Sequence, residues 1–257
     1  MGDPELNVLE IEGVAKAFGG VLALRDISFA VARGELYSVI GPNGAGKSTL
    51  FDIITGLTEP DAGRVRFLGE DITRLRPDER ARRGMARTFQ ELRLFNELTV
   101  FENLVVGPLT RGTGGIVGVL LDSGRARRER DEARAIAEDL LARLKLGHRR
   151  DVPAGVLSHG QKRLVEIGRA LALRPRLLIL DEPTAGLNAE NKALFVDALL
   201  PSLRERSETV LLIEHDMDVV MSASDHVVAL AHGLKIAEGL PGAVQRDPEV
   251  IREYFGT

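Results

Sequence analysis

The chain has 257 residues, of which 44% are hydrophobic and 28% charged, a composition typical of a soluble globular protein. Its 34 lysines and arginines against 38 aspartates and glutamates leave a formal net charge of −4, which argues against a nucleic-acid binder that works by bulk charge. No run approaches the roughly 20 apolar residues that cross a bilayer, and the start of the chain has no apolar signal-peptide core. The absence of cysteine excludes disulfides and thiolate metal sites, so we expect the protein to work in a reducing cytoplasm.

β-type patterns dominate the first third of the chain. Apolar and polar residues alternate over Val8–Glu12 and Val21–Val31, and glycines follow each run, which predicts antiparallel strands. Leu36–Ile40 is a short, largely apolar run, typical of a strand that is buried on both faces. Two further strands are predicted over Arg64–Phe67 and over Met85–Phe89, which ends at Gln90.

A glycine-rich segment joins Leu36–Ile40 to an amphipathic helix at Thr49–Ile54, and it reads Gly41-Pro42-Asn43-Gly44-Ala45-Gly46-Lys47-Ser48. Glycines allow positive φ, so successive N–H groups can point at phosphate oxygens, and the helix start adds its positive end. Lys47 is placed to reach the β- and γ-phosphates, and the Ser48 hydroxyl to bind the Mg²⁺ between them. Such a segment is called a P-loop, and Gly41–Ser48 predicts a nucleoside triphosphate site rather than an ordinary glycine-rich turn.

The middle third changes to helical patterns. Thr99 and Glu102 predict a capping box for a helix over Val100–Val105. A glycine-rich stretch, Gly107–Gly124, then precedes a long charged helix predicted over Arg125–Leu146, which keeps one apolar stripe. We expect a helical subdomain over about 91–159, inserted into a core formed by about 1–90 and 160–257.

Four arginines lie at the start of the charged helix: Arg125, Arg127, Arg128 and Arg130. Such a cluster would suit nucleic acid or lipid headgroups. Glu129, Asp131 and Glu132 alternate with the arginines, so a solvated helix face with paired charges is favoured.

Helices and strands alternate in the last third. Helices are predicted over Gly160–Leu173, Ala189–Arg206 and Met217–Ala223, and strands over Leu177–Asp181, Thr209–Ile213 and Val227–Leu230. Short apolar strands that do not alternate are buried on both faces, as in a mostly parallel sheet. The predicted fold class is α/β, a P-loop NTPase core with an N-terminal antiparallel β subdomain and an inserted α-helical subdomain.

Two carboxylates follow the strand Leu177–Asp181 at the sheet edge where α/β folds bind ligands. Asp181 is positioned to hold Mg²⁺ through water, and Glu182 to polarise an attacking water; the alternative is a strand-end carboxylate that caps the next turn.

Ser158 is a natural N-cap for the helix that follows it, and such a helix start is a possible second phosphate contact.

In this order, the P-loop, Phe89-Gln90, Leu157-Ser158-His159-Gly160-Gln161, Asp181-Glu182 and His215 resemble the nucleotide-binding subunits of ATP-binding cassette (ABC) transporters. The resemblance covers nearly the whole chain. It implies that ATP is bound with Mg²⁺ and hydrolysed. It also implies that each site is completed by a second ATPase subunit, identical or paralogous, through the signature motif, which is Leu157–Gln161 in this chain.

The resemblance also implies individual roles. Gln90 would sense Mg²⁺ and the membrane partner, Ser158, Gly160 and Gln161 would contact the γ-phosphate held by the opposite subunit, and His215 would contact the γ-phosphate of its own. Phe18 would stack on adenine, with a packed core aromatic as the alternative, and a lone strand-end histidine is otherwise often structural. The implied catalytic residues are Lys47, Gln90, Glu182 and His215. The implied nucleotide contacts within the chain are Phe18, the loop Gly41–Ser48 and Thr49. The implied metal ligands are Ser48, Gln90 and Asp181.

Further likeness narrows the family to the branched-chain amino acid importer ATPases. It lies in the P-loop with Thr49-Leu50-Phe51, in Arg87–Gln90, in Asp181–Asn188, in Ile213–Met217 and in the terminal Val250–Gly256. His159 stands where many relatives carry glycine, and Asn188 where many carry aspartate in the D-loop; neither change removes a phosphate ligand. The open alternatives are an ATPase for lipopolysaccharide export or lipid transport, and an ABC ATPase that does not serve transport.

The resemblance implies separate transmembrane permeases and a solute-binding protein as partners, with the chain on the cytoplasmic face of the membrane and no nucleic acid. The permeases would dock on Gln90–Phe95 and on the helical subdomain. Ordinary packing is the alternative for Leu92, Leu94 and Phe95.

Overall fold

The computed structural model describes residues 7–88, 92–111, 124–205 and 209–255. Phe89, Gln90, Arg206, Gly256 and most of the Gly107–Gly124 stretch lie outside these residues. The chain forms two compact units. The core unit holds the described residues up to Met85, Arg176–Glu182 and those from Pro201 onward, and the helical unit holds Ala86–Pro175 and Pro183–Leu200.

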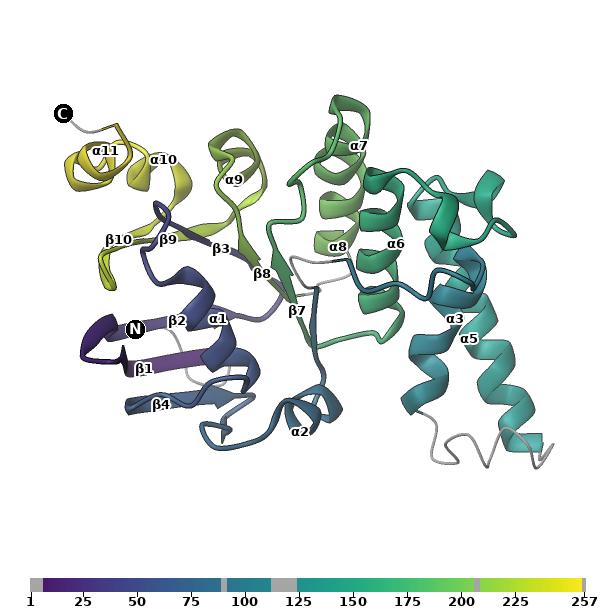
Figure 1. Ribbon diagram of the computed structural model, residues 1–257, viewed down its shortest axis with the longest axis horizontal. Helices are drawn as coiled ribbons and strands as arrows, with labels where there is room; N and C mark the ends of the chain where they lie inside the picture. Colours follow the sequence, from purple (N-terminus) through teal and green to yellow (C-terminus); the bar gives the residue numbers. More distant parts are fainter. Residues whose placement is uncertain (1–6, 89–91, 112–123, 206–208, 256–257) are drawn as a thin grey trace. The chain divides into compact units, whose positions relative to one another are not determined.

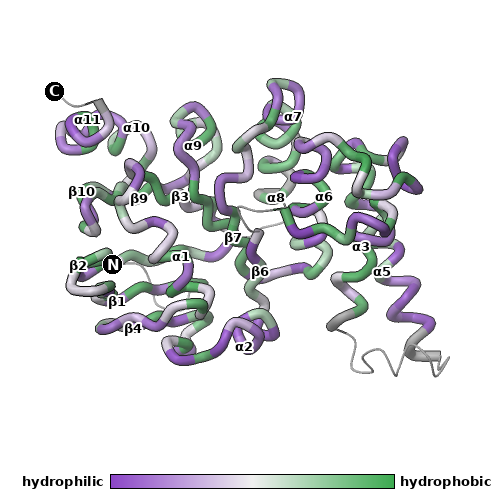
Figure 2. The backbone as a smooth tube through the Cα atoms, viewed as in Figure 1, coloured by the Kyte–Doolittle hydropathy of each residue, from purple (hydrophilic) through white to green (hydrophobic). Residues whose placement is uncertain are grey.

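A six-stranded sheet has the order β10-β9-β3-β8-β7-β6. Its strands are β3 (Leu36–Ile40), β6 (Met85–Arg87), β7 (Leu177–Asp181), β8 (Thr209–Ile213), β9 (His226–Ala231) and β10 (Leu234–Gly239). β9, β3, β8 and β7 run parallel, and β10 pairs antiparallel with β9. Residues of β3, β7 and β8 are buried throughout, which confirms the reading of apolar runs as interior strands, and Figure 2 draws these strands mostly in the hydrophobic colour.

A second, antiparallel sheet has the order β2-β1-β4-β5, formed by β1 (Asn7–Phe18), β2 (Val21–Ala32), β4 (Ala62–Phe67) and β5 (Glu70–Asp71). Its strands are longer than the sequence patterns predicted, because the register shifts along the β1–β2 and β1–β4 pairs break the alternation without ending the pairing. One apolar cluster joins both sheets to α1 (Lys47–Thr55), whose Phe51 is fully buried.

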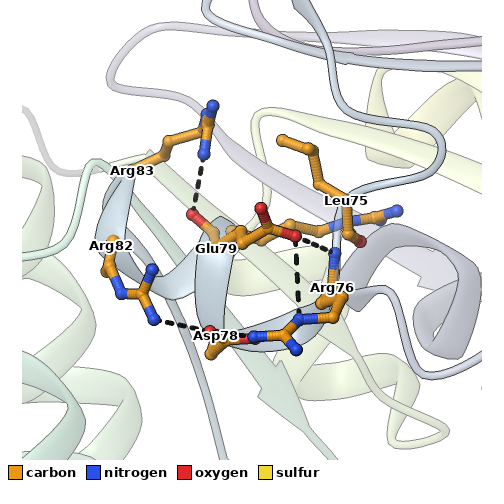
Figure 3. Close-up of polar contacts among 7 residues, drawn as sticks. Leu75, Arg76, Asp78, Glu79, Arg82 and Arg83 are labelled. Atoms are coloured by element: carbon orange, nitrogen blue, oxygen red, sulfur yellow. Dashed lines mark hydrogen bonds and ion pairs between the residues drawn. The ribbon is translucent and has the colours of Figure 1, made fainter.

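The helix α2 (Pro77–Arg82) was not predicted, because its six residues are almost all polar. Its exposed side carries ion pairs of Arg76 and Arg82 with Asp78 (Figure 3), and the Arg76 N–H donates to the Glu79 carboxylate at 2.8 Å at the start of the helix. Its inward residue is Arg80, which is fully buried and donates hydrogen bonds to the carbonyl oxygens of Ile53 and Ile54 at the end of α1.

The remaining helices of the core unit are α8 (Leu200–Glu205, mostly within it), α9 (Met217–Ala223), α10 (Pro241–Val244) and α11 (Pro248–Phe255). The bounds of α9 match the prediction. The strand β10 and the helices α10 and α11 were not predicted, since each is short.

The helical unit consists of α3 (Val100–Arg111), α5 (Gly124–Arg143), α6 (His159–Ala172) and α7 (Ala189–Ala193), with the short helices η1 (Gly147–Arg149), η2 (Ala154–Val156) and η3 (Leu194–Leu199). α3 packs against α5 and α6. Gly168 permits this close approach, since a Cβ there would lie 2.6 Å from Leu144 and 2.8 Å from Leu104. The unit includes 160–175 and 183–200, which the sequence patterns alone assigned to the core.

Two helix predictions in this unit were wrong in part. α3 does not end at Val105 but continues through Gly107 and Pro108 to Arg111. Gly107 faces α6, where a Cβ would lie 3.2 Å from the Arg169 carbonyl oxygen. The predicted helix over Ala189–Arg206 contains a π-helical segment, η3. The predicted cap at Thr99 is confirmed, since Thr99 and Glu102 exchange hydrogen bonds. Figure 2 shows much of α5 in the hydrophilic colour, as its charged sequence predicts.

Candidate functional site

The glycine-rich loop lies between β3 and α1 (Figure 1), as the sequence predicted. Gly41, Gly44 and Gly46 all have positive φ, and Gly46 is the N-cap of α1. Within the described part of the chain, no atom lies within 4 Å of a Cβ built on Gly44, so an anion can approach the backbone there. The loop therefore combines an open backbone at Gly44 with a helix start, an arrangement that suits phosphate.

Lys47 is the cation of this loop and is 8% exposed. Its ammonium donates to the carbonyl oxygens of Gly41 at 2.6 Å and Pro42 at 3.0 Å. Burial lowers the pKa of Lys47, while the carboxylates of Glu182 and Asp181 oppose that shift, which places both carboxylates close to the loop. Pro42, Asn43, Ala45, Ser48 and Thr49 complete the loop and the start of α1, with Asn43 and Ser48 exposed.

Asp181 and Glu182 follow β7 in different environments. Asp181 ends the strand in register with Ile213 and is 8% exposed. Glu182 has a φ of 46°, in the left-handed region that side chains rarely adopt, and its N–H donates to the Ile213 carbonyl at 3.0 Å. Such backbone strain outside glycine is concentrated at functional sites.

His215 follows β8, and its Nδ1 lies 3.9 Å from a carboxylate oxygen of Glu182. The two residues that the sequence analysis singled out on different strands are therefore brought together. Glu214 was not predicted to have a role: it is fully buried, and its carboxylate accepts from the N–H groups of His215 and Asp216. Glu214 thereby fixes the backbone that carries His215; the signal was its charge directly after an apolar strand.

Phe18 lies at the end of β1 and is 51% exposed. The Lys16 ammonium is 5.4 Å from its ring centroid. The packed-core alternative for Phe18 is therefore wrong, and the ring is available to a planar ligand.

Ser158, Gly160 and Gln161 form the start of α6 in the helical unit. Ser158 caps the helix: its hydroxyl accepts from the Gln161 N–H, and the Gln161 side chain accepts from the Ser158 N–H. Gly160 is buried against Asn191, whose amide occupies the space of a Cβ. The Asn188 side chain accepts from the Asn191 N–H at 2.9 Å, so asparagine serves as the N-cap of α7, as aspartate also could.

A cavity of about 460 Å³ lies within the helical unit beside this helix start. Ser158, Gln161 and Asn188 are among its lining residues. Gln90, the remaining predicted site residue, lies outside the described residues.

The residues fit a magnesium nucleotide on three observations: the open backbone over Gly44, the buried Lys47 ammonium, and the hydroxyl and carboxylate oxygens of Ser48 and Asp181, which are the donor atoms that Mg²⁺ prefers. Among the described residues, no helix is long and apolar enough to span a bilayer.

Comparison with known proteins identifies the family. Residues 24–185 match the family model described as ABC transporter. The chain is 42% identical over 250 residues to the high-affinity branched-chain amino acid transport ATP-binding protein BraF of Pseudomonas aeruginosa, covering 97% of this chain and 98% of that protein.

Solved structures agree with the sequence match. An ATP-binding cassette of an ABC transporter in its ADP conformation is 38% identical, with a TM-score of 0.83 over 98% of this chain and 100% of that one. A dimeric bacterial ABC transporter cassette is 27% identical, with a TM-score of 0.76 over 91% of this chain and 98% of that one. These matches confirm the predicted α/β fold class, and the chain belongs to the ABC transporter family as one of its ATP-binding cassettes.

Proposed function

We propose that this chain is the ATP-binding and ATP-hydrolysing subunit of a transporter that imports branched-chain or related amino acids. The observation that carries the proposal is the 42% identity with the branched-chain amino acid transport protein BraF over almost the full length of both chains. The loop over Gly41–Ser48 and the carboxylates after β7 provide the chemistry such a subunit needs.

The loop binds the triphosphate through its N–H groups and Lys47. Burial lowers the pKa of Lys47, and the Glu182 and Asp181 carboxylates oppose that shift and so favour the cation that the phosphates need. Phe18 stacks on the adenine with its exposed ring. Ser48, Asp181 and Gln90 are the residues proposed to hold Mg²⁺, which when bound neutralises charge on the β- and γ-phosphates.

Glu182 accepts hydrogen bonds from the attacking water and orients it for in-line transfer of the γ-phosphoryl group. His215 is proposed to donate to a γ-phosphate oxygen, and its distance of 3.9 Å from the Glu182 carboxylate supports a shared site. The strained backbone of Glu182 and the buried Glu214 fix the positions of these two side chains.

Ser158, Gly160 and Gln161 serve the nucleotide of a second cassette, identical or paralogous, as the dimeric relative suggests. Two cassettes close around ATP and separate after hydrolysis, because the γ-phosphate distinguishes the two states. We further propose permeases and a solute-binding protein as partners, with the chain on the cytoplasmic face of the membrane. Phe95, half exposed with the Arg169 guanidinium 5.5 Å from its ring centroid, belongs to the proposed docking surface.

Reconstitution tests the proposal. The chain is purified from detergent-extracted membranes with its associated proteins, placed in proteoliposomes, and assayed for uptake of leucine, isoleucine and valine with ATP inside the vesicle or outside. We expect polytopic partners and uptake that depends on ATP on the cassette side, with the Lys47→Ala complex as the inactive control. Extraction with ribosomes or DNA, or lipopolysaccharide release in place of amino-acid uptake, would contradict it.

A further inference from the structure

The C-terminal helix α11 belongs to a motif, Val250–Gly256, that the proposed chemistry does not use. Asp247 starts the helix: its carboxylate accepts from the N–H groups of Glu249 and Val250 at 2.8 and 3.3 Å. The helix has two distinct faces. Val250 is 3% exposed, whereas Ile251 is 37% and the Arg252 side chain 59% exposed. The buried face therefore has a specific contact surface in the core unit.

That surface is the strand end from which the phosphate-binding loop begins. Val250 and Tyr254 pack in one apolar cluster with Ile40 and Ala229, which are partners in the parallel register of β3 and β9. The residue after Ile40 is Gly41, and a Cβ on Gly41 would overlap the Leu230 carbonyl oxygen. The first glycine of the loop is thus held tightly between β9 and the cluster that α11 completes.

Tyr254 provides the polar group on this buried face. Burial raises the pKa of its phenol to about 12, and the Gly41 backbone opposes part of that rise. The side chain therefore lies near the first residue of the loop as well as against the cluster that contains Ile40.

A second connection runs through the turn between β9 and β10. His232 and Gly233 form this turn with positive φ values of 49° and 76°. The Gly233 N–H donates to the Ala45 carbonyl in the middle of the loop at 3.2 Å, and the His232 Nε2 lies 3.1 Å from a carboxylate oxygen of Glu253. α11 therefore contacts the turn through Glu253, and the turn in turn donates a hydrogen bond to the loop at Ala45.

We propose that α11 is a positioning element for the phosphate-binding loop, with Tyr254 packed against the cluster at Ile40 and Glu253 in contact with His232, whose neighbour Gly233 donates to Ala45. This inference rests on the proposed binding of ATP by that loop. A loop held in its binding conformation loses little entropy when phosphates bind, so α11 raises affinity without contacting nucleotide. Tyr254 and Glu253 are therefore positioning residues.

The experiment compares variants on the two faces of α11. Glu253→Ala and Tyr254→Ala remove the two connections, while Glu253→Gln and Tyr254→Phe are milder versions that keep most of the packing. Ile251→Ala and Arg252→Ala, on the exposed face of the same helix, are matched controls. Each variant is assayed for KM and kcat of ATP hydrolysis and for thermal unfolding without nucleotide, with wild type and Lys47→Ala alongside.

We expect KM for ATP to rise about tenfold in Tyr254→Ala, because positioning acts on binding. The rise in Glu253→Ala should be about twofold, because its partner His232 is 81% exposed. In both variants kcat at saturating ATP should stay at the wild-type value. The milder variants should show smaller rises in the same direction, and the controls none. Loss of thermal stability alone, with KM at the control value, would show a merely structural helix and overturn the inference.

The two proposals fail in distinguishable ways. Wild-type protein that neither binds nor hydrolyses ATP would overturn both. Wild-type protein that hydrolyses ATP and loses activity in Lys47→Ala, while every α11 variant matches its controls, would overturn only the role of α11.

Discussion

The Lys47 ammonium donates a hydrogen bond to the Gly41 carbonyl oxygen at 2.6 Å, so the lysine closes the loop from which it extends. The same buried group is the loop's cation for phosphate. Loop geometry and ligand affinity therefore depend on one side chain.

Replacement of Lys47 by alanine removes that cation. We expect ATP affinity to fall about 10- to 100-fold, the loss that follows when a charged hydrogen bond worth about 1.5–3 kcal/mol is removed. Equilibrium binding of ATP to Lys47→Ala measures the effect, with the exposed Lys145→Ala as the control. Unchanged affinity would contradict the phosphate assignment.

Glu182→Gln separates binding from hydrolysis. The amide keeps the size of the side chain but cannot accept a proton, so turnover should fall about 10²- to 10⁴-fold while ATP stays bound. ATP-bound dimer should then accumulate, which light scattering coupled to gel filtration detects. Turnover at the wild-type rate would show that another group orients the water.

Much of the core unit could be predicted, because its interior strands have clear patterns. The bounds of Leu177–Asp181 and Thr209–Ile213 were correct to the residue, since both runs are apolar and end at polar residues. α11 was not predicted, although its eight residues are clearly amphipathic, because the helix is short. Only the resemblance of Val250–Gly256 to the importer ATPases pointed to this segment.

The sequence predicted the candidate site residues, of which the structure describes all but Gln90, but it did not predict the contacts that support them. Lys47, Asp181 and Glu182 come together because parallel strands end at one edge of the sheet, a rule that sequence reasoning can use. The contacts of Glu214 with the backbone after β8 and of Glu253 with His232 depend on tertiary packing. No local pattern distinguishes such carboxylates from surface ones.

Arg80 provides a test of stability on the short helix α2. Its buried guanidinium also donates to the Leu75 and Thr73 carbonyl oxygens, and burial lowers its pKa to about 10. Arg80→Met would leave buried carbonyls without donors, so the free energy of unfolding should fall by about 3 kcal/mol.

Chemical denaturation measures that loss, and Arg82→Met is the matched control. Arg82 is 73% exposed and pairs with Asp78 on the outer side of the same helix, as Figure 3 shows. Its replacement should leave stability close to wild type, because exposed ion pairs contribute little. Equal losses in the two variants would contradict the structural role of Arg80.

The two tyrosines predict an alkaline titration. Burial is the main cause that raises the pKa of Tyr254 to about 12 and raises that of Tyr37, whose hydroxyl donates to Glu238 at 2.8 Å. Native protein should therefore show little tyrosinate absorbance at pH 10, where unfolded protein is about half ionised.

The sign for stability follows from the same shift. A phenol that holds its proton more tightly when folded stabilises the fold below its unfolded pKa, and Tyr254 loses that contribution as the pH rises from about 10 to 12. Comparison with Tyr254→Phe isolates this residue. Half ionisation of the native protein at pH 10 would show that the phenols are accessible to solvent.

The central claim is that this chain hydrolyses ATP in a site that two cassettes share. A mixture of Lys47→Ala with Ser158→Arg tests it, because a mixed dimer has one site with an intact loop from one subunit and an intact signature motif from the other. Each variant alone should be inactive, and an equal mixture should recover up to about a quarter of wild-type hydrolysis in a symmetric dimer with random pairing. A mixture as inactive as its components, or wild-type turnover by Ser158→Arg alone, would contradict the shared site.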